Sequence, residues 1–487
     1  MKIHKSLPVL LMLLAIAACG GGSGSNDDNG GGGVVPPPSN GIVRTGMVVG
    51  PIASFGSVVV NGVHYETNAA TITVDGQPAT QDDLRVGQVV SMVAELEDGA
   101  ASGTASSVSF DDNVEGPIES IDAASGVLVV LGQTVRIGTS TSFDDSILPR
   151  SIEGLAVGDF VEVSGLVKAD GSIDATRIEM KAVGGEFEVH GVVAALDTAN
   201  LRFNLNALVV DYSGAQLDDF PGAAIADGQP VEAKGTTLDA NGALIATRVE
   251  YKGSLVTGAE DDFAEIEGFI TRFASAQDFD VSGLCIITGA ATTFEGGTAA
   301  DLGLDIKVEV EGIFDGAGCL SARKVDIRLG TAVRVTALID TIDVANDSLV
   351  LLGIPVDVDS LTRMEDQSDA DVEPLTLSDL AVGDYLEIRG GERLAGSGRV
   401  QAALLEREDL DTDTELQGFV SAVAAPTLTI LGVTIQTDGS TQFRDVNDSP
   451  LSAAEFFNQV ATGSLVKADG AENSSTTILA REVELEN

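Results

Sequence analysis

The feature that most limits the possible folds of this chain is a sequence pattern that recurs six times after Arg44. The clearest copy opens at Val114-Glu115-Gly116 and closes at Ala175-Thr176-Arg177. The opening glycine recurs as Gly46, Gly116, Gly191, Gly268 and Gly418, with Ala337 in the fifth copy, and the closing alanine as Ala105, Ala175, Ala246, Ala322, Ala402 and Ala480. A sequence pattern that recurs at a regular interval along a chain indicates tandem copies of one structural unit. We predict six repeats, at residues 45–110, 111–182, 183–253, 261–329, 330–408 and 414–487.

Each repeat contains short runs rich in Val, Ile, Leu and Thr that alternate with polar residues, which predicts five β-strands. The last two strands form a hairpin, with turn residues that tolerate positive φ at Asp98-Gly99, Asp170-Gly171, Asn241-Gly242, 316–318, 396–398 and Asp469-Gly470. A Val-Gly-Asp motif precedes the fourth strand at Gly158 and Gly383 and appears as Val86-Gly87-Gln88 and Asp227-Gly228-Gln229 in repeats one and three. In repeats four and six we expect Asp305 and Phe456 in place of its glycine. The only helical turn expected is at 453–458.

This pattern predicts an all-β chain of six tandem, small, five-stranded OB-like antiparallel β-barrels. Small β-sandwiches are the alternative. Closing each sheet into a barrel would hide the strand edges that open sheets in an array would expose.

The N-terminus predicts export. Lys2 and Lys5 precede the apolar stretch 7–18, which is too short to span a bilayer but fits a signal peptide at residues 1–18. The stretch runs into Cys19-Gly20 and resembles a lipobox, which implies that the Cys19 thiol is acylated; the alternative is an ordinary signal cleavage site. Residues 19–44 then form a lipidated cysteine and a Gly/Pro-rich linker. By this resemblance, Gly20 indicates sorting to the outer membrane, facing the periplasm or the exterior.

The repeats resemble a family common in bacterial lipoproteins and catalogued as domain of unknown function 5666. The resemblance rests on the opening glycine, a Thr-x-Phe motif (141–143, 292–294 and 441–443), the Val-Gly-Asp motif and the Ala-Thr-Arg-Ile-Glu ending. It covers nearly all of the chain after the linker. It implies the repeat architecture and a place in the cell envelope, and it implies no particular activity.

Two cysteines remain after Cys19, and both lie in repeat four. Alignment with repeat two places Cys285 on the third strand and Cys319 at the start of the fifth. These strands are neighbours in an OB-like barrel, and an exported protein meets an oxidising environment. We therefore predict a Cys285–Cys319 disulfide, with two buried thiols as the alternative.

Charge limits the partners. The chain has 27 Lys and Arg against 75 Asp and Glu, a net charge of −48, so it repels nucleic acid and anionic membrane surfaces. Acidic clusters lie between repeats, and alternating carboxylates can supply the hard oxygen ligands of calcium. We predict weak calcium sites at Asp111, Asn113 and Glu115 and at Asp409, Asp411 and Asp413; the alternative is a solvated acidic surface. No other cofactor is expected.

No catalytic motif is recognisable in the sequence. It lacks zinc-protease spacing, a nucleophile elbow and a P-loop, and the two histidines after the signal, His64 and His190, are expected to pack or face solvent. We expect no enzymatic activity. The sequence favours a non-catalytic envelope lipoprotein whose tandem barrels space or present binding surfaces to protein partners. The alternative is a calcium-dependent adhesin or a glycan-binding surface protein.

Overall fold

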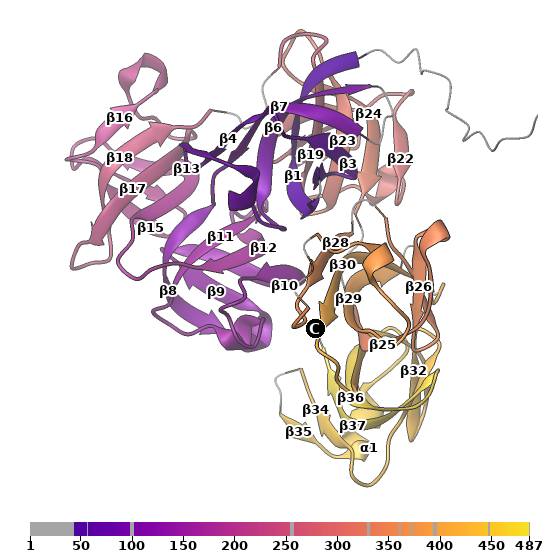
Figure 1. The fold of residues 1–487 in the computed structure, drawn as a ribbon. Helices are drawn as coiled ribbons and strands as arrows, with labels where there is room; N and C mark the ends of the chain where they lie inside the picture. The colour runs from indigo at the N-terminus through magenta and orange to yellow at the C-terminus, as the bar shows by residue number, and fades with distance from the viewer. Residues whose placement is uncertain are drawn as a thin grey trace, which may run out of the picture. The chain divides into compact units, whose positions relative to one another are not determined.

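The computed structural model describes residues 43–486, apart from residues 56, 98–101, 254–257, 329–331, 360–361, 371, 373, 393–396 and 447–448. The predicted signal peptide, Cys19 and nearly all of the linker lie outside this part. The described chain is almost entirely β-structure, with one α-helix, α1 (Ala453–Gln459) (Figure 1). No helix in this part is long and apolar enough to cross a lipid bilayer.

The first three repeats contain the strands numbered β1 to β18. Repeat 1 comprises β1 (Val43–Ser54), β2 (Val58–Val60), β3 (Val63–Glu66), β4 (Thr71–Val74), β5 (Gln77–Ala79), β6 (Val89–Glu97) and β7 (Ser102–Phe110). Repeat 2 comprises β8 (Val114–Asp122), β9 (Val127–Val130), β10 (Gln133–Phe143), β11 (Phe160–Val167) and β12 (Ile173–Met180). Repeat 3 comprises β13 (Phe187–Asp197), β14 (Arg202–Leu205), β15 (Leu208–Asp211), β16 (Gln216–Asp218), β17 (Pro230–Leu238) and β18 (Leu244–Tyr251).

The last three repeats follow the same order. Repeat 4 comprises β19 (Phe263–Ser275), β20 (Asp278–Val281), β21 (Leu284–Ile287), β22 (Thr293–Glu295), β23 (Lys307–Phe314) and β24 (Leu320–Ile327). Repeat 5 comprises β25 (Val333–Asp343), β26 (Ser348–Leu351), β27 (Ile354–Asp357), β28 (Arg363–Asp366), β29 (Tyr385–Glu392) and β30 (Val400–Glu408). Repeat 6 comprises β31 (Asp413–Ala424), β32 (Thr427–Ile430), β33 (Val433–Gln436), β34 (Gln442–Arg444), β35 (Pro450–Leu451), β36 (Leu465–Ser474) and β37 (Thr477–Leu485).

Each repeat is a closed five-stranded barrel, as the sequence predicts. In repeat 2, β8 pairs with β9, β9 with β10, β10 with β12, β12 with β11, and β11 returns to β8. The pairing of β10 with β12 is parallel, whereas the other four are antiparallel. A wholly antiparallel barrel is therefore not formed. The reason is geometric, because directions cannot alternate all the way around a ring with an odd number of strands.

A glycine marks a bulge in the fourth strand of five repeats: Gly165, Gly235, Gly312, Gly390 and Gly470. A Cβ atom at Gly312 would lie 2.5 Å from the backbone oxygen of Ser321 on the next strand, so no side chain fits there. The turn predicted at Asp469-Gly470 is therefore wrong. These residues lie within β36, and Gly470 is the bulge glycine, while the chain reverses at residues 475–476.

The Val-Gly-Asp motif makes the tight turn before the fourth strand, with φ of +96° at Gly158. Asp305 takes the same place in repeat 4, with φ of +60°. The placement of Phe456 there is wrong, because Phe456 lies in α1 with its side chain in the core. Gly463, with φ of +91°, makes the turn of repeat 6. The inserted helix moves this turn further along the chain in repeat 6. Alignment of the repeat sequences therefore did not place Gly463 at the motif position.

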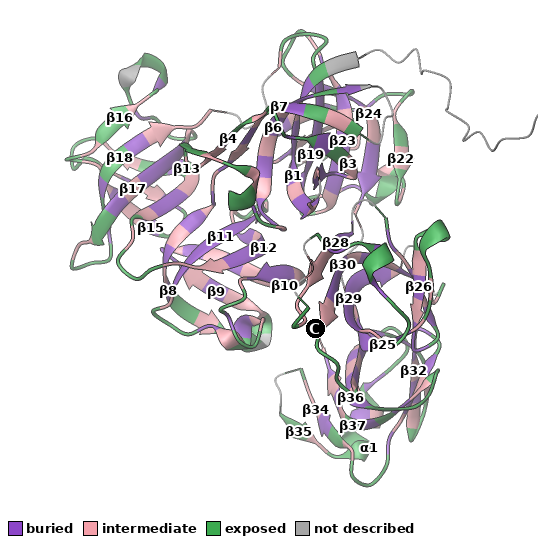
Figure 2. Cartoon of the chain, in the orientation of Figure 1, coloured by how far each residue is buried: buried purple, intermediate pink, exposed green. Residues whose placement is uncertain are grey.

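The barrels are joined in pairs through their first strands. The strand β8 pairs antiparallel with β13, β25 pairs antiparallel with β31, and β1 pairs parallel with β19, so that three sheets each contain two barrels. Buried apolar side chains form one continuous cluster through repeats 2 and 3 and another through repeats 5 and 6. Figure 2 shows in purple the buried positions along the strands of these barrels. The two barrels of such a pair therefore share a core.

Candidate functional site

A row of four glutamates crosses the joint between repeats 2 and 3. On adjacent strands, Glu188 of β13 lies opposite Glu115 of β8, Glu115 opposite Glu162 of β11, and Glu162 opposite Glu179 of β12. Residues directly opposite one another point to the same face of a sheet, and like charges in such positions are destabilising. Glu162 is nevertheless only 2% exposed and Glu188 only 6%.

Asp112 adds a fifth carboxylate to this face. It precedes β8, is only 2% exposed, and neither of its carboxylate oxygens has a hydrogen-bond partner. Burial, followed by the negative charges of Glu188 and Glu162, raises the pKa of Asp112 well above its ordinary value. An unpartnered buried carboxylate is costly, so its position requires either a proton or a cation.

Lysines neutralise part of the row. Lys181 forms an ion pair with Glu162 and lies 3.9 Å from Glu179, and the Lys234 ammonium lies 2.6 Å from a carboxylate oxygen of Glu188. Burial raises the pKa of Glu162 to about 7 despite the attraction of Lys181. No lysine forms an ion pair with Asp112 among the described contacts, so the positive charge is concentrated at the two ends of the row.

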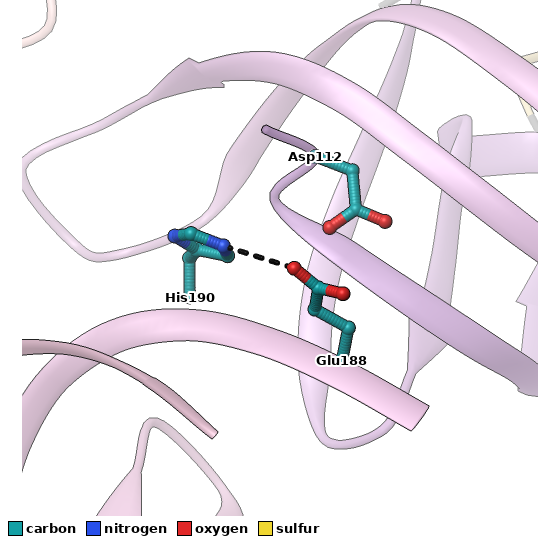
Figure 3. A group of neighbouring side chains, drawn as sticks. All are labelled: Asp112, Glu188 and His190. Carbon is teal, nitrogen blue, oxygen red and sulfur yellow. Dashed lines mark hydrogen bonds and ion pairs between the residues drawn. The ribbon is translucent and has the colours of Figure 1, made fainter. Parts of the chain in front are cut away.

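His190 closes the repeat 3 side of the cluster (Figure 3). Its Nε2 atom lies 3.4 Å from a carboxylate oxygen of Glu188 and 3.2 Å from one of Glu232. Burial opposes protonation of the ring, but the hydrogen bonds to Glu188 and Glu232 prevail and raise the pKa of His190 to about 9. His190 therefore acts as a positive partner of two glutamates at neutral pH. His64, by contrast, is exposed and contacts the hydroxyl of Ser57 at 3.1 Å.

Two groups of side chains around Asp112 have the spacing of metal ligands. Asp112, Glu115 and Glu162 offer three carboxylate oxygens, and Asp112, Glu188 and His190 offer two oxygens and a ring nitrogen. In each group the ligand atoms lie within 4.8 Å of one another. Asp112 was not a candidate in the sequence. Strand alternation could not have found it, because Asp112 precedes β8 and lies with Glu115 rather than with the buried Val114.

The structure separates the residues predicted to bind calcium before β8. Asp111 lies 3.7 Å from the ammonium of Lys252, and Asn113 accepts a hydrogen bond from the backbone N–H of Gly165 at 2.6 Å. Glu115 is the one predicted ligand that joins a possible metal-binding group. The predicted D-x-N-x-E trio thus contributes only its last member.

The second predicted trio is not gathered into such a group among the described residues. Asp409 accepts a hydrogen bond from the backbone N–H of Asp369 at 2.9 Å, and Asp411 accepts one from that of Thr412 at 2.5 Å. Asp413 forms an ion pair with Arg481 at 2.7 Å. These carboxylates act as local turn and surface partners.

The structure joins Cys285 and Cys319 in a disulfide, with the two Cα atoms 4.7 Å apart. Cys285 lies on β21, and Cys319 immediately precedes β24. The strands β21 and β24 pair in parallel. Asp278 and Asp280 lie near Cys285, but Arg272 holds both at 2.6 Å. With the sulfur already bonded, this group offers no metal site.

Repeats 5 and 6 also contain buried acidic side chains. One of these side chains predicts that the stability of this pair of barrels depends on pH. Burial raises the pKa of Glu406 on β30 to about 8, helped by Glu387, Glu365 and Glu408 and opposed by Arg389 at 3.3 Å. Folding thus favours the protonated form. The contribution of Glu406 to the free energy of unfolding is fully present below the pKa of a glutamate in the unfolded chain, about 4.3. It is lost as the pH rises through about 8, the pKa of Glu406 in the folded protein.

We expect the free energy of unfolding of the repeat 5–6 pair to fall by at least about 1.4 kcal/mol between pH 6 and pH 9, the equivalent of one pKa unit. Calorimetric melting at several pH values measures this fall. Glu406→Gln should flatten the profile, whereas Glu153→Gln, at an exposed position, should leave it unchanged. An identical slope in wild type and Glu406→Gln would contradict this assignment.

Comparison with known sequences agrees with the six barrels. The family described as Domain of unknown function (DUF5666) matches residues 45–109, 115–179, 190–250, 267–326, 334–406 and 417–484, and each match falls within one predicted repeat. No curated protein sequence matches the chain. Since the six segments together make up well over half of its length, the chain belongs to the DUF5666 family and carries six tandem copies of the domain.

Proposed function

We propose that this chain is a non-catalytic, lipid-anchored protein of the bacterial cell envelope whose barrels space and present binding surfaces to envelope proteins. The observation that carries the proposal is the pairing of barrels through their first strands. Backbone hydrogen bonds join the two barrels of each pair, and a shared core fixes repeats 2 and 3, and repeats 5 and 6, each as one body. A rigid body of this kind holds surfaces at a defined separation, which is what a presenting array requires.

The anchor in this proposal is the acylated Cys19, followed by the Gly/Pro-rich linker to the first barrel. Two or three acyl chains contribute about 0.8 kcal/mol for each buried CH₂, enough to hold a protein at a bilayer. The net charge of −48 disfavours adsorption to an anionic membrane by the barrels themselves. Attachment would therefore depend on the lipid alone.

The test starts with Cys19→Ala. We expect the wild-type protein to incorporate labelled palmitate and to sediment with membranes, and Cys19→Ala to lose the label and most of the sedimentation. Cys285→Ser/Cys319→Ser is the matched control, because it removes two cysteines and leaves Cys19 in place. Labelling of Cys19→Ala at the wild-type level would contradict the anchor.

Presentation is tested in the same cells with a photo-crosslinking residue. At Phe419, which is 50% exposed on β31, we expect adducts with discrete envelope proteins. At the neighbouring Val420, which is 1% exposed, we expect none. The absence of adducts at Phe419 and at other exposed strand positions such as Val192, which is 56% exposed, would contradict the proposal.

The alternative function is a calcium-dependent adhesin or a glycan-binding surface protein. The carboxylate group around Asp112 favours this alternative over a purely structural array. Crosslinks that form only with added calcium, and to glycan rather than protein, would support it.

A further inference from the structure

The strongest chemical feature of the described residues that the proposed function leaves unused is the carboxylate group at the joint of repeats 2 and 3. We propose that Asp112, Glu115 and Glu162 form a calcium site there. The inference is independent of the lipid anchor, because binding is measured on the purified protein.

The geometry fits one ion. One oxygen from each of the three side chains lies within 4.8 Å of the others. Calcium binds oxygens at 2.3–2.6 Å, so two ligands on opposite sides of one ion are about 4.8 Å apart. The three carboxylates can supply further oxygens by binding in bidentate fashion, toward the six to eight that calcium takes.

The absence of a hydrogen-bond partner for the buried carboxylate of Asp112 distinguishes this group from an ordinary acidic surface. Asp112 is only 2% exposed, and both of its carboxylate oxygens lack a hydrogen-bond partner. Buried polar atoms are nearly always paired, so this one requires a partner that the protein itself does not provide. The side chain projects from the turn before β8 toward the row of glutamates, as Figure 3 shows for Glu188.

The charge balance fits a divalent ion. When a bound ion displaces the protons, Asp112, Glu115 and Glu162 carry three negative charges, and Lys181, paired with Glu162, supplies one positive charge. The remaining two negative charges equal the charge of one divalent cation. A cation here would also remove the repulsion between Glu115 and Glu162, which lie directly opposite each other on β8 and β11.

The ligand chemistry favours calcium over other metals. All three donors are carboxylate oxygens, which suit hard cations. Magnesium holds several waters in an octahedral shell, whereas Asp112 and Glu162 are each only 2% exposed and leave little room for water. The second group would offer a transition metal the ring of His190, but its Nε2 atom already lies between Glu188 and Glu232.

The site would stiffen the joint between the two barrels. Asp112 and Glu115 belong to the segment that enters repeat 2, and Glu162 lies on β11, the neighbour of β8 within the same barrel. The strand β8 is also the one that pairs with β13 of repeat 3. An ion bound here would therefore hold in place the strand of repeat 2 that pairs with repeat 3.

The test is calorimetric titration of CaCl₂ into the full-length protein after treatment with a chelator. We expect one calcium ion per chain, with a Kd of about 10⁻⁵ to 10⁻³ M, and a higher melting temperature in millimolar calcium. Asp112→Asn should abolish both effects. Asp411→Asn is the matched control, since it removes a carboxylate from an exposed acidic cluster and should bind calcium as wild type does.

The variants also report on folding. Without calcium, Asp112→Asn should melt no lower than wild type, because an amide replaces an unpartnered buried carboxylate. If it fails to fold, Glu115→Gln, at a half-buried position, provides the second test and should weaken binding at least about tenfold.

Three results would overturn the proposal. The first is no heat and no melting shift in wild type with calcium. The second is calcium binding that persists in folded Asp112→Asn. The third is a response to ZnCl₂ but not to CaCl₂ that is lost in His190→Gln, which would assign Asp112 to the group with Glu188 and His190.

Discussion

Phe203→Ala is expected to lower the free energy of unfolding of the repeat 2–3 pair by about 3–5 kcal/mol. Phe203 lies on β14, is fully buried, and belongs to the apolar cluster that runs through both barrels. Truncation removes the transfer free energy of the ring and leaves a cavity that the closed barrel cannot easily fill. Because a typical domain is stable by only about 5–15 kcal/mol, this loss should be large enough to separate the pair from the rest of the chain in melting.

Scanning calorimetry is the measurement, since the chain has no tryptophan and its repeats can melt separately. We expect one transition to move down in temperature and to carry the enthalpy of two barrels, because repeats 2 and 3 share a core. Phe419→Ala is the control, with the same change of side chain at a position that is 50% exposed, and should cost less than about 0.5 kcal/mol. Equal shifts from the two variants would contradict this account of the core.

Removing the Cys285–Cys319 disulfide is expected to destabilise repeat 4 by about 3–4 kcal/mol. The cysteines are 34 residues apart, and a loop of this length restricts the unfolded chain by that amount in the chain-entropy model. The barrel of repeat 4 depends on the parallel pairing of β21 with β24, which spans only two residue pairs, and the disulfide lies beside it. The bond therefore supports the weakest part of the barrel's closure.

The measurement has two parts. Alkylation of the denatured protein without reductant should leave Cys285 and Cys319 unlabelled, as seen by peptide mass. Reductant should lower the melting temperature of wild type and leave that of Cys285→Ser/Cys319→Ser unchanged, because the variant has no bond to lose. Labelling of both cysteines before reduction would show that the protein carries free thiols.

The sequence predicted the barrels because each copy repeats the same strand and turn chemistry. Averaging over six copies reveals a motif that a single copy would leave ambiguous. The errors lie where one copy departs from the others. In repeat 6 the insertion of α1 displaced the turn glycine to Gly463, and the dipeptide Asp469-Gly470 mimics a hairpin turn although it occupies a bulge.

The candidate site was less accessible to sequence analysis. Alternation along β11 indicates that Glu162 points away from the core of its own barrel, which would normally mean toward water. Its burial arises from contacts made by residues distant in the sequence, and single-sequence periodicity carries no information about those contacts. Asp112 was missed for a related reason, because the pattern of carboxylates around it drew attention to its two neighbours.

The first strands impose a rule on how such chains can grow. Each first strand has two neighbours in its own barrel and uses its remaining length to join one other repeat, 1 with 4, 2 with 3 and 5 with 6. The first strand of each repeat is thereby paired on both sides, and no first strand among the described residues is left to recruit a further copy. Loss or duplication of a single copy would leave one first strand unpaired along part of its length, and such a strand is prone to aggregation. The number of copies in this architecture should therefore change by two at a time during evolution.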